Sequence, residues 1–280
     1  RQGIPGIGGV DTRAITRRLR TAGVMMGTIT SDESEEGACK RLRSIKRYDD
    51  IDFVKGVSTK VPYKWDPSAE PTLAGKYHIV VIDGGLKYNI LRILRSLGCE
   101  VTAVPCAFSE EVILALKPDG ILLSPGPGDP ALLDYLVTTV KKLVGRKPIM
   151  GICLGHQLLG RAFGADTFKL KFGHRGANHP VRDLGTGRVY ITAQNHGYAV
   201  DGGGLRDGLE VSQINLNDQT VEGLRHRELP IFSIQYHSEA SPGPPGGSTG
   251  DASWRSRLAV RCREAARARS VAGLGLSAAG

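Results

Sequence analysis

The stretch Lys147-Pro148-Ile149-Met150-Gly151-Ile152-Cys153-Leu154-Gly155-His156-Gln157 decides the fold of this chain. A short apolar run follows the charged residue Lys147. This favours a buried strand over residues 148–152. Residues 154–163 have helical character, and a turn of small residues joins the strand to the helix. This is the nucleophile-elbow pattern, with the sulfur of Cys153 where hydrolases carry an oxygen. Cys153 is therefore a candidate nucleophile, although a lone cysteine between glycines is as often a buried and inert residue.

Strand and helix patterns alternate on the amino-terminal side of this elbow. From residue 77 onward they are predicted in turn over 77–83, 87–97, 100–104, 109–117, 120–124, 131–145, 148–152 and 154–163. Such alternation is typical of an α/β fold with a doubly wound, mostly parallel sheet. Later apolar stretches predict further strands over 189–194, 211–215, 221–226 and 231–236. The elbow would then lie at the carboxyl end of a strand, where an open α/β sheet places its ligands.

A second candidate cluster is Tyr236-His237-Ser238-Glu239, directly after an apolar, alternating stretch. His237 and Glu239 are two residues apart, so an extended backbone points both side chains to the same side. A carboxylate there can hold the imidazole in one tautomer while the other ring nitrogen faces the thiol. We therefore expect Cys153 as nucleophile, His237 as base and Glu239 as orienting carboxylate. Taken alone, a His-x-Glu pair is more often a surface pair at a strand end.

The motifs around these residues resemble the class I glutamine amidotransferases. They are Gly151-Ile152-Cys153-Leu154-Gly155-His156-Gln157, Ser124-Pro125-Gly126-Pro127-Gly128-Asp129-Pro130 and His237-Ser238-Glu239. More narrowly, three segments resemble the small, glutamine-hydrolysing subunit of carbamoyl-phosphate synthase. They are residues 169–174 with 178–181, residues 192–201 and residues 239–244. The resemblance runs from about the first residues to Pro244. It departs at Ser238, where the family commonly has proline.

The resemblance implies that the site hydrolyses L-glutamine. Cys153 would attack the side-chain amide and form a glutamyl thioester, and His237 would carry the protons. The oxyanion would be held by the backbone N–H of Leu154 and by those of Gly126 and Gly128, since the proline between the glycines has no N–H. From the residues alone, the glycine–proline loop is equally well a tight turn after a strand.

The substrate contacts are also carried over from the resemblance. Gln157 and Asn195 would bind the α-amino and carboxylate ends of glutamine, and Gly197 and Tyr198 would contribute through their backbone. Without the resemblance, Gln157 is an ordinary solvated helix residue and Asn195 an ordinary turn former.

The resemblance further implies a partner, the large subunit of carbamoyl-phosphate synthase. That subunit would use the ammonia, with bicarbonate, to make carbamoyl phosphate for arginine and pyrimidine synthesis. We expect no cofactor in this chain, and ATP and Mg²⁺ on the large subunit. Two alternatives stay open: the glutaminase subunit of another class I amidotransferase, or an impaired fragment that acts as a binding or regulatory subunit.

Three regions are expected. Residues 1–72, with a short helix that starts near Asp11 and ends near Gly23, resemble the C-terminal part of the family's N-terminal domain, the earlier part of which the chain lacks. Residues 73–244 form the amidotransferase domain. Residues 245–280 are a divergent basic tail that we expect to be poorly ordered.

Composition excludes several classes of protein. The net charge is +9, but six arginines against two acidic residues place a net +4 in residues 244–280, so we expect no nucleic-acid partner. Charges or glycines interrupt every apolar run, so we expect no membrane segment. The five cysteines are scattered and odd in number, which favours a reducing compartment. We expect the cytoplasm, or the plastid stroma if the source is a plant or alga.

No metal is expected either. His174 and His179 are close in sequence, but they lie in what is predicted to be a glycine-rich loop, with no further ligand at a useful spacing.

Overall fold

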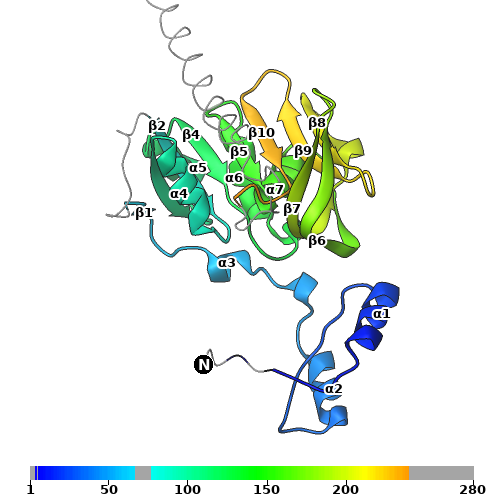
Figure 1. The fold of residues 1–280 in the computed structure, drawn as a ribbon. Helices are drawn as coiled ribbons and strands as arrows, with labels where there is room; N and C mark the ends of the chain where they lie inside the picture. Colours follow the sequence, from blue (N-terminus) through cyan, green and yellow to red (C-terminus); the bar gives the residue numbers. More distant parts are fainter. Residues whose placement is uncertain (1–3, 5, 67–76, 240–280) are drawn as a thin grey trace, which may run out of the picture.

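The computed structural model describes residues 4, 6–66 and 77–239, and one ten-stranded sheet runs through them (Figure 1). The strands are β1 (Tyr63–Lys64), β2 (Tyr77–Asp83), β3 (Cys99–Pro105), β4 (Gly120–Leu123), β5 (Ile149–Ile152), β6 (Thr167–Asp183), β7 (Val189–Val200), β8 (Leu209–Asn215), β9 (Val221–His226) and β10 (Ile231–Ile234). Their order across the sheet is β1-β3-β2-β4-β5-β10-β9-β8-β6-β7.

The half of the sheet from β3 to β10 is parallel and is covered by helices on both faces. The helices are α4 (Tyr88–Ser96), α5 (Glu110–Ala115), α6 (Asp134–Leu143) and α7 (Leu154–Ala162), with two short 3₁₀ turns, η2 (Pro130–Leu132) and η3 (Gly202–Gly204). Val80 and Ile82 of β2 pack in the core with α5, α6 and α7, whereas Ile79 and Val81 pack with α4. This alternation within one strand confirms the predicted doubly wound α/β architecture.

The other half of the sheet is antiparallel and contains the main difference from the sequence prediction. Residues 167–183 form the long strand β6, which pairs with β7, and not the glycine-rich loop that was predicted around His174 and His179. Glycine and asparagine are depleted in strands, so composition hid this one. Two irregularities in its pairing accommodate the unusual sequence, and Gly173 and Gly176 adopt positive φ angles of 67° and 129° beside them.

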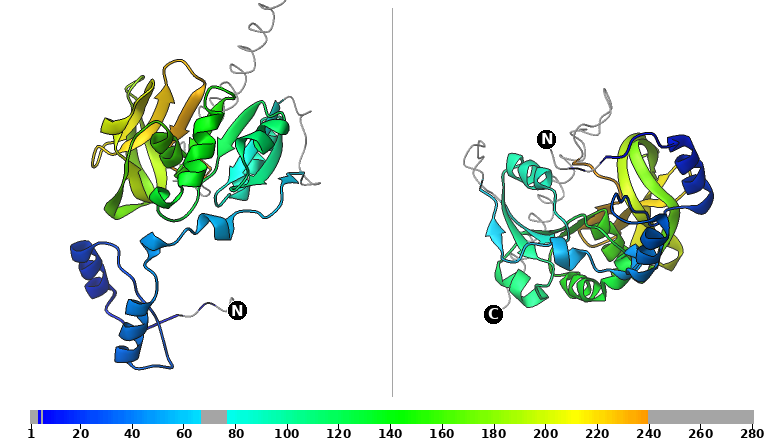
Figure 2. Two further views of the ribbon diagram at one scale, coloured as in Figure 1. Left: turned by 180° about the vertical axis from the view of Figure 1, so that it is seen from behind. Right: turned by 90° about the horizontal axis from the view of Figure 1, so that it is seen from below.

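The N-terminal segment carries α1 (Thr12–Ala22), α2 (Glu35–Ser44), η1 (Tyr48–Asp50) and α3 (Val54–Val57). In the left view of Figure 2, α1 and α2 lie below the sheet and its helices, while α3 runs along their lower edge. As predicted, α1 begins at Asp11, whose carboxylate accepts from the N–H of Ala14 at 2.9 Å, and ends at Gly23 with φ 84°. Strand β1 pairs with β3 and so joins this segment to the sheet. The region boundary at residue 72 and the tail beyond 244 lie outside the described residues, and their assignment stays a prediction.

No helix in the described ranges is long and apolar enough to cross a membrane.

Candidate active site

Cys153 occupies a strained backbone position between β5 and α7. Its φ and ψ are 52° and −103°, a region that residues other than glycine rarely adopt. Its N–H donates to the carbonyl of Ile234 at 2.9 Å, and its own carbonyl accepts from the N–H of His156 at 3.1 Å. These two hydrogen bonds hold Cys153 in its strained backbone conformation. A nucleophile on such a turn, at the start of a helix, is what the elbow pattern predicts.

The two glycines that flank Cys153 are required by close packing. A Cβ on Gly151 would lie 2.5 Å from the carbonyl oxygen of Gly155, and a Cβ on Gly155 would collide with the backbone of Leu123 in β4. Helix α7 therefore begins directly against the sheet. This brings the first, unpaired N–H groups of the helix close to the sulfur.

His237 lies next to Cys153 and in contact with Glu239. The chain leaves β10 and the N–H of His237 donates to the carbonyl of Ala193 at 2.9 Å, which fixes the backbone. Its Nδ1 lies 2.7 Å from Oε1 of Glu239. Cys153 lines the same cavity as His237 and lies close enough to contribute to the raised pKa of the ring. Because Nδ1 faces the carboxylate, Nε2 is the nitrogen available to the sulfur. The structure therefore brings together the three residues predicted as nucleophile, base and orienting carboxylate.

The pKa values of His237 and Glu239 are shifted by their contacts, which together outweigh the effect of burial. Burial lowers the pKa of His237, but the hydrogen bonds to Cys153 and Glu239 outweigh it and raise the pKa to about 10. Burial alone would raise the pKa of Glu239. The contact with His237 outweighs the effect of burial, so the pKa of Glu239 is lowered. Both shifts favour an imidazolium paired with a carboxylate.

Lys87 is a member of the site that the sequence analysis missed. Its Nζ lies 3.0 Å from Nδ1 of His237 and 3.2 Å from Oε1 of Glu239. Nδ1 cannot donate to the carboxylate and accept from an ammonium at once, and the shorter contact belongs to Glu239. We therefore assign Lys87 as an ion-pair partner of Glu239. Its position just after β2, at the carboxyl edge of the sheet, is the signal that could have found it.

A cavity of about 460 Å³ opens in front of the sulfur, a size typical of small-molecule sites. Among its lining residues are most of the predicted site: Gly126, Gly128, Cys153, Gln157, Asn195, Gly197, Tyr198 and His237. Glu239 is only 3% exposed and lies behind His237. Leu154 is buried as the first residue of α7, so its contribution is limited to its backbone N–H.

Gln157 is buried beneath the cavity and is not a solvated helix residue. Its amide nitrogen donates to the carbonyl of Tyr198 at 2.8 Å and to Oε1 of Gln235 at 3.1 Å. The amide oxygen is therefore the group that it can offer to a ligand, and an ammonium is the natural partner for a buried carbonyl-type acceptor.

Two of the predicted site residues are held by the N-terminal segment. The N–H of Gly128 donates to the hydroxyl of Tyr48 at 3.1 Å, and the hydroxyl of Tyr198 donates to Oδ1 of Asp49 at 2.7 Å. Burial and the contact with Asp49 raise the pKa of Tyr198, so it remains a neutral donor. Gly128 is a predicted oxyanion donor, so its N–H has to leave Tyr48 in order to reach an oxyanion.

Comparison with known proteins assigns the chain to a family. The family model of glutamine amidotransferase class-I matches residues 80–251, and the chain therefore belongs to this family. A GMP synthase protein from Thermoplasma acidophilum has a similar fold, with a TM-score of 0.58 and 23% identity over 70% of this chain and 98% of that one. At this identity the likeness concerns the fold alone.

The curated relatives give a narrower assignment. The carbamoyl phosphate synthase small chain of Akkermansia muciniphila is 47% identical over 95% of this chain and 73% of its own length. That of Methanocaldococcus jannaschii is 51% identical over 86% and 68%, and the chloroplastic one of Oryza sativa subsp. japonica is 46% identical over 87% and 56%. Within its class the chain is a member of the carbamoyl phosphate synthase small chains, and it spans between about half and three quarters of the length of these relatives.

Proposed function

We propose that this chain hydrolyses glutamine at Cys153, His237 and Glu239 and delivers the ammonia to the large partner of a carbamoyl phosphate synthase. The observation that carries the proposal is the hydrogen-bonded pair His237–Glu239 next to Cys153, at a cavity of about 460 Å³ that Cys153 and His237 line. The relatives named carbamoyl phosphate synthase small chain support the choice of this synthase over another amidotransferase.

The reaction begins with His237 holding at Nε2 the proton that the Cys153 sulfur gives up, because the raised pKa of His237 favours the imidazolium. The sulfur then bonds to the amide carbon of glutamine, and the negative charge moves to the amide oxygen. As the carbon–nitrogen bond breaks, His237 returns the proton to the departing nitrogen, which leaves as ammonia. A glutamyl thioester remains. Water then attacks it with His237 as base, and glutamate and free Cys153 are regenerated.

The oxyanion forms next to the start of α7. The N–H of Leu154 follows the nucleophile directly and has no acceptor within the helix, so it is the first donor. Gly128 supplies a second N–H once this group releases the hydroxyl of Tyr48 and donates to the oxyanion instead. The geometry at Gly126 also requires glycine, because a Cβ there would collide with the backbone of Gly84.

Recognition of glutamine depends on polar groups around the cavity. The buried amide oxygen of Gln157 accepts from the α-ammonium of the substrate, and Asn195 with the backbone of Gly197 and Tyr198 holds the α-carboxylate. A site built from such fixed contacts rejects analogues that lack either charged end, because its buried polar groups would then be left unpaired.

A reconstitution assay tests this function. The chain is mixed with the large partner of a carbamoyl phosphate synthase and with ATP, Mg²⁺ and bicarbonate, and carbamoyl phosphate is measured with glutamine or with ammonium chloride as nitrogen source. We expect glutamine-dependent synthesis that disappears in Cys153→Ala while the ammonium-dependent synthesis stays. Glutamine-dependent synthesis that persists in Cys153→Ala would contradict the proposal, as would ammonia release without any transfer to this synthase.

ATP and Mg²⁺ belong to the large partner in this proposal, and the chain itself contributes no cofactor to glutamine hydrolysis. The compartment follows from the source: the cytoplasm, or the plastid stroma in a plant or alga. Two plant relatives, from rice and Arabidopsis thaliana, carry names that specify the chloroplast.

A further inference from the structure

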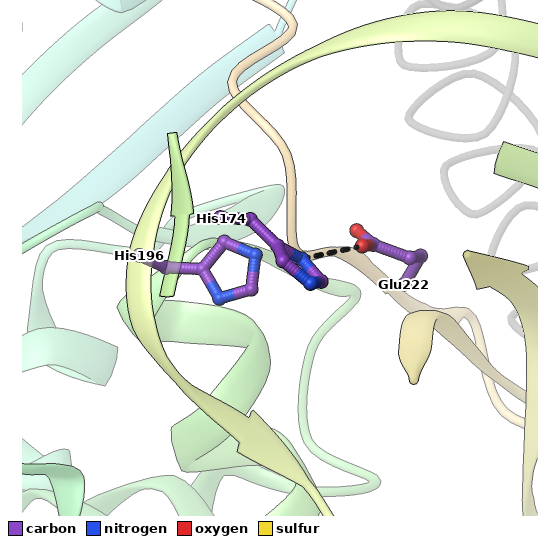
Figure 3. Close-up of side chains that lie close together, drawn as sticks. All are labelled: His174, His196 and Glu222. Carbon is purple, nitrogen blue, oxygen red and sulfur yellow. Dashed lines mark ion pairs between the residues drawn. The ribbon is translucent and has the colours of Figure 1, made fainter. Parts of the chain in front are cut away.

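At the wall of the cavity, which His196 helps to line, three side chains of metal-binding type meet from three strands. They are His174 of β6, His196 of β7 and Glu222 of β9 (Figure 3). All three are buried, at 7%, 5% and 0% exposure, and one potential ligand atom from each lies within 4.8 Å of the others. His174 and His196 are directly paired in the register of β6 and β7. This cluster plays no part in the proposed hydrolysis.

Each histidine has one ring nitrogen occupied and one pointing into the cluster. Nδ1 of His196 lies 2.8 Å from the carbonyl of Tyr198, so it carries the proton and leaves Nε2 as a lone pair. Nε2 of His174 lies 2.8 Å from the carboxylate of Asp218, which leaves Nδ1. Neither inward nitrogen has a hydrogen-bond partner among the described residues. Metal-ligating histidines show this arrangement, with the outer N–H held by a carboxylate or a backbone carbonyl.

The carboxylate of Glu222 is oriented in the same way. Gln194 donates to its Oε2 at 2.8 Å and Asn215 donates to its Oε1 at 2.8 Å. A fully buried carboxylate needs a positive charge beside it. The nearest candidate is His174, whose Nδ1 lies 3.4 Å from Oε1, a separation that Figure 3 marks with a dashed line.

We propose that His174, His196 and Glu222 bind a divalent transition-metal ion of the Zn²⁺ class. Two imidazoles and a carboxylate are a recurrent zinc ligand set. With metal–ligand bonds of about 2.1 Å, two tetrahedral ligands lie roughly 3.4 Å apart, so His174 and Glu222 already have the required separation. The ligand atom of the third residue, His196, lies within 4.8 Å of the other two, so it has to move inward by at most about 1.4 Å.

The ion would act on the structure of the site and not on the reaction. His196 stands between Asn195 and Gly197, which line the glutamine cavity. A metal that joins β6, β7 and β9 at this point fixes the stretch of β7 that presents these groups. No metal was expected from the sequence, because no third ligand stands at a useful spacing from His174 and His179. The fold supplies the ligands from residues 196 and 222, far along the chain.

A proton is the alternative occupant. Burial lowers the pKa of His174, but its contacts with Glu222 and Asp218 outweigh it and raise the pKa, so an imidazolium could fill the same role between two carboxylates. The experiment has to separate these two states.

The chain is freed of metal with a chelator and titrated with Co²⁺, whose visible absorption reports tetrahedral nitrogen and oxygen ligation, and then with Zn²⁺. We expect saturation at a single equivalent, displacement of Co²⁺ by Zn²⁺, and a rise in the unfolding temperature with either ion. The saturable binding, the displacement and the rise in unfolding temperature all disappear in Glu222→Gln and in His174→Gln. The control His179→Asn keeps them, because the ring of His179 lies beside that of His174, with centroids 5.0 Å apart, but outside the ligand set.

Circular dichroism of the metal-free proteins shows whether each variant folds. A second readout needs no variant: nitrogen-15 spectra of labelled histidines should show Zn²⁺-dependent shifts at Nδ1 of His174 and Nε2 of His196. Three results would overturn the proposal: no saturable binding, binding that survives both ligand substitutions, or His174 that remains protonated on both nitrogens when Zn²⁺ is in excess.

Discussion

Nδ1 of His237 lies 2.7 Å from Oε1 of Glu239, which leaves Nε2 of the same ring for Cys153 in the shared cavity. The two residues are separated by one position in the turn that follows β10, and both side chains are buried there. Glu239 is buried and contacts neither the cavity nor the sulfur, so it acts through His237. It is a positioning residue, which holds the ring in the tautomer that the chemistry needs.

The first prediction concerns the pKa of His237. Replacing Glu239 with glutamine removes one of the two contacts that raise this pKa to about 10, so the pKa falls. Titration of the His237 imidazole by NMR measures it. Cys153→Ala, which removes the other contact, should lower it as well. An unchanged pKa in both variants would mean that neither contact controls the ring.

The second prediction links this pKa to stability. The pKa of His237 is about 10 in the folded chain against an ordinary 6.5, so the folded state binds more protons between these values. The contribution is fully present below pH 6.5 and is lost as the pH rises through about 10. Denaturant unfolding between these limits should show the free energy of unfolding falling with pH. The free energy of unfolding should fall less steeply with pH in His237→Gln than in the unsubstituted chain. Equal slopes in the two proteins would show that the pKa of His237 does not contribute to stability.

The third prediction tests the packing of the elbow. Gly155→Ala places a Cβ against the backbone of Leu123, which cannot yield as a side chain can, and should cost at least about 2 kcal/mol of the free energy of unfolding. Gly56→Ala in α3 is the matched control, because no atom lies within 4 Å of its added Cβ. That variant should be neutral or more stable by up to about 1 kcal/mol. Equal effects at both glycines would show that α7 is not tightly packed on β4.

The fourth prediction concerns Ser238, which separates the base from its carboxylate. Its side chain is 5% exposed, and its hydroxyl has no hydrogen-bond partner within the described residues. Ser238→Ala removes a buried hydroxyl that forms no hydrogen bond with the described residues. The free energy of unfolding should therefore stay equal or rise by about 1 kcal/mol. Chemical denaturation measures the change. A loss of stability above this size would reveal a partner of the hydroxyl.

The parallel half of the sheet could be predicted from sequence because its signals are local. The apolar run of β2 was placed at residues 77–83, where the structure has it, and α7 within a residue of its observed end. Cys153, His237 and Glu239 could be identified in the same way. Each follows the end of an apolar strand, and strand ends can be located from the sequence.

What sequence could not show depends on distant pairing. Strand β6 is rich in glycine, histidine and lysine and gains its strand character from its pairing with β7. Lys87 carries no motif of its own, and its role exists only because the chain after β2 lies close to the residues that follow β10, where His237 stands. Similarly, Glu222 and His174 are 48 positions apart in the printed sequence and meet only in the folded sheet.

An electrophilic analogue of glutamine, with a reactive group at the amide carbon, tests the catalytic site most directly. After incubation with the intact chain, peptide mass spectrometry locates the adduct. We expect one adduct per chain, on Cys153, that glutamine in excess prevents and that forms far more slowly in His237→Gln. Modification of another cysteine at the same rate, or a Cys153 that stays unmodified while the chain is folded, would contradict the proposed chemistry.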